Sequence, residues 1–236
     1  MGIAENVAEI RERIASAARR AGRSVDEIVL MGVSKTFPAE AIVQAYAAGI
    51  RVFGENRVQE FGEKSASLGS LTDAEWHLIG HLQSNKAGKA AELFHAVDSV
   101  DSLRLAERLH AAAAGLGKKL QVLIEINIGG EEAKAGLHSD SAELEQLLQA
   151  APRLAGLEIR GLMTIPPFAE SADDARPYFR KLRDLRDATA ARKLPGVGME
   201  VLSMGMSHDF EAAIEEGSTC VRVGTAIFGS RSKETE

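Results

Sequence analysis

The chain has 236 residues and a mass of 25.2 kDa, of which 45% are hydrophobic and 26% are charged. This composition predicts one folded α/β domain with a substantial core and excludes a largely disordered chain. The net charge of −6 and the pI near 5.6 disfavour a surface that binds nucleic acid, but they leave room for a small anion in a local positive pocket.

An amphipathic helix is predicted at the N-terminus. Ile3, Val7, Ile10 and Ile14 recur at helical spacing, and Gly22 marks the end of the segment. Charged residues run through this segment, so we expect neither a signal peptide nor a membrane anchor, and the cytoplasm is the expected compartment.

Short runs rich in valine and isoleucine then alternate with longer helical stretches, which is the signature of repeated βα units. Strands are predicted at residues 28–34, 51–53, 75–79, 96–97, 120–127, 158–163, 201–203 and 220–223. Helices are predicted between them at 39–48, 56–65, 103–114, 142–149, 174–191 and 209–216. Eight alternating units favour a closed (β/α)8 TIM barrel over an open doubly wound sheet.

No linker rich in proline, glycine or serine divides the chain. We therefore predict a single barrel domain over residues 1–230, with the N-terminal helix as an extra element, and a flexible tail over 231–236.

The single cysteine, Cys220, excludes an internal disulfide, and its apolar setting is typical of a buried strand thiol.

In a barrel of this kind the carboxyl ends of the strands form the site. Lys35 follows the apolar run IVLMGVS, which predicts an amine at the mouth of the barrel. Desolvation there lowers the pKa of a lysine and supplies the neutral amine that Schiff-base chemistry requires. A solvated lysine at the start of a loop fits the same position equally well.

Glycine and serine meet in the segment SMGMSHD, between the seventh strand and the next helix. Such a turn offers free backbone N–H groups and a hydroxyl, which can hold a phosphate monoester, but an ordinary loop with Ser207 as helix N-cap fits as well. VRVGTAIFG repeats the arrangement after the eighth strand. Because TIM barrels often bind phosphate at these two loops, the pair favours a phosphorylated ligand.

Arg222 lies inside the apolar strand CVRVG and needs a partner there, because an unpaired buried guanidinium is costly. A carboxylate such as Glu125 or Glu200 is slightly favoured over a ligand atom. Neutral hydrogen-bonding groups are expected around the same mouth, at Asn56, Gln83, Asn85 and Asn127.

Metal and nucleotide sites are not predicted. The histidines show no metal-ligand spacing with one another or with the cysteine, and His77, which follows Trp76 on a strand, fits a packed residue better than a general base. The glycine motifs also lack the contexts of nucleotide-binding loops.

Six longer motifs occur in order along the chain: VSKTFP, FGENRVQE, WHLIGHLQSNK, GLMTIPP, LSMGMSHDFEAAIEEGST and VRVGTAIFG. In sequence and spacing they resemble the YggS/PROSC family of pyridoxal-phosphate homeostasis proteins, from the first helix to about Gly229. The resemblance implies a barrel similar to the N-terminal domain of alanine racemase, the fold-type III arrangement, with pyridoxal 5′-phosphate (PLP) at its mouth. Arg57 stands where many members carry an aromatic residue.

The resemblance also implies the roles of the site residues. Lys35 would form the internal aldimine, Ser207, Gly224 and Thr225 would hold the phosphate, and Arg222 would face the pyridine nitrogen. An arginine keeps that nitrogen unprotonated, which weakens the ring as an electron sink. The remaining predicted cofactor-binding residues, which would line the pocket, are Asn56, Ser203 and Met204.

No catalytic residue is assigned, because the family lacks the second domain that supplies the tyrosine base of racemases. The only tyrosines, Tyr46 and Tyr178, fall in predicted helices. The resemblance therefore implies storage and delivery of PLP. The alternatives are a slow PLP-dependent amino-acid racemase or related enzyme, and a barrel enzyme that acts on a sugar phosphate through a Schiff base on Lys35.

The expected partners are PLP and the apo-enzymes that depend on it. The missing racemase domain carries many of the dimer contacts of the racemases, so a monomer is expected.

Overall fold

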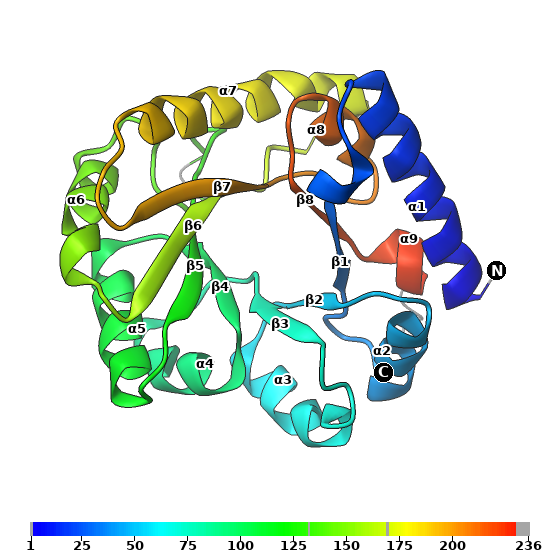
Figure 1. Cartoon of the computed structure of the whole chain (residues 1–236), viewed down its shortest axis with the longest axis horizontal. Coiled ribbons are helices and arrows are strands. Elements are labelled where there is room, and N and C mark those ends of the chain that lie inside the picture. The colour runs from blue at the N-terminus through cyan, green and yellow to red at the C-terminus, as the bar shows by residue number, and fades with distance from the viewer. Residues whose placement is uncertain (1, 132, 169, 230–236) are drawn as a thin grey trace.

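In the computed structural model, eight parallel strands form a closed barrel surrounded by helices (Figure 1). The structure describes residues 2–131, 133–168 and 170–229, so the tail predicted at 231–236 lies outside the described residues. The strands are β1 (Val29–Val33), β2 (Val52–Glu55), β3 (Glu75–Leu78), β4 (Ala96–Val100), β5 (Leu120–Glu125), β6 (Leu157–Met163), β7 (Val197–Ser203) and β8 (Cys220–Val223). Each strand pairs with the next, and β8 pairs with β1, so the predicted TIM barrel is confirmed.

The helices of the described residues are α1 (Ile3–Arg20), α2 (Ala39–Ala47), α3 (Val58–Ser65), α4 (Ala87–Leu93), α5 (Leu103–Gly115), α6 (Ala142–Ala150), α7 (Ala172–Ala191), α8 (Phe210–Glu215) and α9 (Thr225–Phe228). The extra helix α1 packs along α2, α8 and α9 on the outside of the barrel (Figure 1). The short helices α4 and α9 were not predicted. No helix in the described ranges is long and apolar enough to cross a membrane.

The main apolar core lies between the sheet and the helices. Alternate residues of a strand point to opposite faces, and on β5 the side chains of Leu120, Val122 and Ile124 belong to this core. The β4 strand extends to Val100, beyond the predicted 96–97. Sequence pattern missed this extension because two buried polar residues, Asp98 and Ser99, interrupt the apolar run.

Inside the barrel, at its amino end, a buried ion pair joins β3 to β4. The Nδ1 atom of His77 lies 3.1 Å from Asp98 Oδ1, and Asp98 is 1% exposed. Burial by itself lowers the pKa of His77, because it favours the neutral ring. The negative charges of Asp98 and Glu75, and their hydrogen bonds with the ring, outweigh burial and raise the pKa of His77 to about 9. His77 is thus a packed residue with a partner, as predicted.

Burial raises the pKa of the Cys220 thiol to about 12, which fits its predicted structural role.

The raised pKa of His77 predicts a pH dependence of stability. The protonated ring should contribute fully below about pH 6.5, and its contribution should be lost as the pH rises through about 9. The loss should approach about 3 kcal/mol in the free energy of unfolding, measured by denaturant titration from pH 6 to pH 10. His77→Gln should flatten this slope, and an equal slope in wild type and variant would contradict the assignment.

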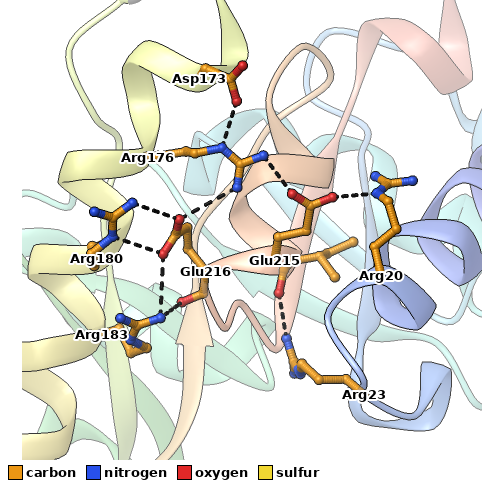
Figure 2. Close-up of polar contacts among 9 residues, drawn as sticks. Arg20, Arg23, Asp173, Arg176, Arg180, Arg183, Glu215 and Glu216 are labelled. Atoms are coloured by element: carbon orange, nitrogen blue, oxygen red, sulfur yellow. Dashed lines mark hydrogen bonds and ion pairs between the residues drawn. The ribbon is translucent and has the colours of Figure 1, made fainter.

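A network of ion pairs fastens α7 and α1 to α8 (Figure 2). Glu216, at the end of α8, lies within 3.5 Å of the guanidinium groups of Arg176, Arg180 and Arg183. The neighbouring Glu215 is shared between α7 and α1; its partners are Arg176 and Arg20, each 2.6 Å away. These pairs hold in place the helix that follows β7, and with it the turn that precedes α8.

Glu216→Gln should lower the free energy of unfolding by about 1 to 2 kcal/mol, because three guanidinium groups lose one shared carboxylate. Chemical denaturation at low salt measures the effect. Glu92→Gln is the matched control, since Glu92 pairs with Lys89 in an exposed pair and should cost under about 0.5 kcal/mol. Equal losses of unfolding free energy in the two variants would show that the network stabilises the protein no more than one exposed ion pair does.

Candidate functional site

A pocket of about 410 Å³ opens at the carboxyl ends of the strands. Its walls come from the ends of β1, β2, β3, β6 and β8 and from the turns after β7 and β8. The lining residues are Val33, Lys35, Asn56, Ile79, Gly80, Ile165, Met206, Ser207, His208, Arg222, Gly224 and Thr225. Six of the eight predicted cofactor-binding residues are among them.

Lys35 is presented by a tight turn after β1. The N–H of Phe37 donates to the carbonyl of Ser34 at 3.1 Å, and Thr36 adopts a left-handed conformation with φ of 68°. Lys35 is half-buried and, like Val33, lines the pocket.

A buried ion pair between Lys64 and Glu55 holds this turn in place. Lys64 Nζ lies 2.8 Å from Glu55 Oε1 and donates to the carbonyls of Ser34 at 3.3 Å and Phe37 at 3.4 Å. Glu55 is fully buried and also accepts from the Ser34 hydroxyl at 2.6 Å. Burial raises the pKa of Glu55, while the hydrogen bonds from Lys64 and Ser34 act against that rise. One lysine therefore neutralises a buried carboxylate and ties both ends of the turn that carries Lys35.

The turns after β7 and β8 are joined to each other. The N–H of Gly224 donates to Ser207 Oγ at 3.3 Å, and the N–H of Met206 donates to Asp209 Oδ1 at 2.6 Å. Among the described residues, the N–H groups of Ser207 and Thr225 have no acceptor. Asp209, not Ser207, occupies the N-cap position of α8. The alternative in which Ser207 caps this helix is therefore wrong.

Gly205 allows this turn to form. Its φ is 96°, a conformation that L side chains rarely adopt, and an added Cβ would lie 2.6 Å from Ala213 Cβ. The close approach of the turn to α8 therefore requires glycine here.

Arg222 is 3% exposed and is held by neutral oxygens. Its guanidinium donates to Ser203 Oγ and to the Thr164 carbonyl, both at 2.7 Å. The expected ion pair with Glu125 or Glu200 is wrong: within the described chain no carboxylate lies within 4.0 Å of this guanidinium. Glu200 points away from the barrel interior. Its side chain is exposed and pairs with Arg160.

Ser203 and Met204 lie behind the pocket lining. Both are fully buried, and Ser203 reaches the pocket only through its hydrogen bond with Arg222. Met204 packs in the core, where its carbonyl accepts from the Ser218 hydroxyl at 2.7 Å.

Asn56 brings a polar atom without a partner to the pocket. Its Oδ1 is buried and has no hydrogen-bond donor among the described residues. The adjoining Gly80 must be glycine, because an added Cβ would lie 2.3 Å from the Asn56 carbonyl oxygen. A buried acceptor of this kind is costly unless water or a ligand donates to it.

The other polar groups predicted at the mouth lie outside this pocket. Asn127 donates to the carbonyls of Glu131 and Lys134 and so shapes the loop after β5. Sequence analysis missed the apolar lining residues, Val33, Ile79, Ile165 and Met206, and also His208. The first three carried a usable signal, since they occupy interior positions at or just beyond the ends of β1, β3 and β6.

The fold and the site define a class of protein: a TIM barrel with a pocket at its mouth. The pocket is lined by a lysine after β1 and by the turns after β7 and β8, which present backbone N–H groups without acceptors among the described residues. Comparison with known proteins agrees with this class. The sequence model described as "Alanine racemase, N-terminal domain" matches residues 6–232. The chain is 46% identical over 231 residues to the "Pyridoxal phosphate homeostasis protein" of Aquifex aeolicus, covering 98% of this chain and 99% of that protein. Identity to the Escherichia coli K12 protein of the same name is 47% over 231 residues, covering 97% of each.

Solved structures give the same result. PipY of Synechococcus elongatus PCC7942 with PLP bound is similar with a TM-score of 0.82 at 41% identity, covering 96% of this chain and 100% of that chain. Alanine racemase of Streptomyces coelicolor A3(2) shares the fold with a TM-score of 0.68 at 22% identity, covering 95% of this chain and 59% of that chain. The chain belongs to the alanine racemase N-terminal domain family and, within it, to the pyridoxal phosphate homeostasis proteins.

Lys64→Met should destabilise the protein by about 3 kcal/mol, because it leaves Glu55 buried without its cation. Thermal and urea unfolding measure the loss. Glu60→Gln is the control, since Glu60 is a more exposed partner of Lys64 at 3.4 Å and should cost under about 1 kcal/mol. The double variant Lys64→Met/Glu55→Gln should recover part of the lost stability; no recovery would show that the pair does not carry the effect.

Proposed function

We propose that this chain binds PLP in the pocket at the barrel mouth and serves in PLP homeostasis, storing and delivering the cofactor rather than catalysing a reaction. The observation that carries the proposal is one pocket that combines Lys35, the joined turns at Ser207 and Gly224, and the buried Arg222. The names of the relatives and the PLP-bound PipY structure support it.

The turns after β7 and β8 fit a phosphate monoester. The described residues leave N–H groups of Ser207 and Thr225 without acceptors, and the Ser207 hydroxyl lies beside them. Convergent backbone N–H groups and a hydroxyl are the usual ligands of a phosphate dianion. Ser207, Gly224 and Thr225 would hold the phosphate.

Lys35 would hold the other end of the cofactor. The aldehyde of PLP condenses with a neutral amine, losing one water and forming a carbon–nitrogen double bond. The turn fixed by Lys64 directs the Lys35 side chain into the pocket, and the unpaired Asn56 Oδ1 offers an acceptor for a donor group of the ligand.

Arg222 would face the pyridine nitrogen. Its guanidinium stays protonated and can only donate, so a ring nitrogen facing it must accept and remain unprotonated. An unprotonated ring withdraws electrons weakly, which favours holding the cofactor over carbanion chemistry. Ser203 would fix Arg222, and Met204 would back this wall.

The positions of the tyrosines also favour a protein without racemase activity. Tyr46 lies on α2, bonded to Asp73, and Tyr178 lies on α7. Neither lines the pocket. We propose further that the protein acts as a cytoplasmic monomer that passes PLP to apo-enzymes.

Adding PLP to the purified protein should produce an absorbance band of a covalent adduct, and borohydride reduction followed by peptide mapping should place the label on Lys35. Lys35→Ala should lose the band while keeping the wild-type unfolding temperature, because Lys35 lies in the pocket and not in the core. A label on another lysine would contradict the role of Lys35. A sugar-phosphate enzyme would show no such band.

Ser207→Ala should weaken PLP binding by about 1.5 to 3 kcal/mol, the worth of a charge-assisted hydrogen bond, which is roughly a 10- to 150-fold rise in Kd. Fluorescence or absorbance titration measures it. Ser139→Ala, at an exposed serine outside the pocket, should leave the Kd unchanged. An unchanged Kd in Ser207→Ala would remove Ser207 from the phosphate site.

A further inference from the structure

A second hollow, of about 380 Å³, lies between α4 and α5 and shares no lining residue with the pocket at the mouth. Its walls come from Ser84 and Asn85, in the turn after β3, and from Arg104 and Arg108 on α5. The two helices lie side by side in the outer ring (Figure 1). We call this hollow the α4–α5 cleft.

Two guanidinium groups in this cleft lack a partner. Among the described residues, neither Arg104 nor Arg108 has a hydrogen-bond acceptor within 3.5 Å or a carboxylate within 4.0 Å. Many arginines elsewhere are paired, as in the network around Glu216. Even Glu107, between them in sequence, pairs with Arg153.

The positions of these arginines are electrostatically unfavourable for the empty protein. They are four residues apart on one helix, where like charges repel. Arg104 is also the second residue of α5, where the helix dipole disfavours a cation. Both arginines are exposed, so solvent reduces these two costs in the empty protein. A bound anion would reverse both of them.

The floor of the cleft is kept open by small residues. Ala87, Gly88 and Ala111 complete its lining, and a Cβ added to Gly88 would meet no atom within 4 Å. The volume is in the usual range for small-molecule sites. Opposite the arginines, the Ser84 hydroxyl and the Asn85 amide offer further donors.

We infer that the α4–α5 cleft binds a phosphate dianion, either free phosphate or the phosphate group of a small ester. Two planar guanidinium forks match its charge and its oxygens. The small size of the cleft suits a small molecule better than an acidic protein segment. The cleft opens beside the carboxyl ends of β3 and β4, at the same end of the barrel as the pocket.

Calorimetric titration of the full-length protein with inorganic phosphate and with glycerol 3-phosphate tests this site. Arg104→Gln/Arg108→Gln should lower the affinity at least about tenfold. Arg19→Gln removes an exposed, unpartnered arginine on α1 and should change nothing. Without ligand, the double variant should unfold at the same temperature as the wild type or higher, because the like-charge pair is gone.

The Ser207→Ala variant separates this site from the pocket. Binding that survives Ser207→Ala and disappears in the double arginine variant supports the cleft. Equal affinity for the two probes would then indicate free phosphate, and tighter binding of glycerol 3-phosphate would indicate an ester. Binding lost only in Ser207→Ala, or no heat with either probe up to about 10 mM, would overturn the inference and leave the proposed PLP site untouched.

Discussion

Closure of the eight-stranded parallel barrel is the constraint on which the site depends. Because every strand runs in the same direction, the carboxyl ends of β1, β2, β3, β6 and β8 and the turn after β7 meet at one mouth. Residues as distant in sequence as Lys35 and Thr225 thereby line one pocket. The pairing of β8 with β1 places Arg222 opposite Met31 and brings the turn after β8 next to the turn that carries Lys35.

The polar groups around this mouth are supported in different ways. The lysine turn stands on a buried ion pair, Glu55 with Lys64, whereas Arg222 is held by the neutral oxygens of Ser203 and Thr164. A guanidinium with neutral partners keeps its full positive charge available to a ligand. Neither Tyr46 on α2 nor Tyr178 on α7 lines this pocket.

Much of the fold could be predicted from the sequence, because most strands are short apolar runs between helical stretches. The prediction was incomplete where polar residues are buried inside the barrel, as in β4, where Asp98 pairs with His77. The site was predicted mainly from polar residues at strand ends and from the family resemblance. The predicted partner of Arg222 was wrong because strand pattern does not show that Ser203 and the Thr164 carbonyl, rather than the buried Glu125, bond the guanidinium. The apolar wall at Ile79 and Ile165 was missed because those residues look like core.

The most direct test of this account is a crystal structure of the protein grown with PLP. The account predicts electron density continuous with Lys35 Nζ, a phosphate against the Ser207 and Thr225 turns, and the ring nitrogen within hydrogen-bond distance of Arg222. A cofactor bound elsewhere, or one whose phosphate avoids both turns, would contradict the assignment of the pocket.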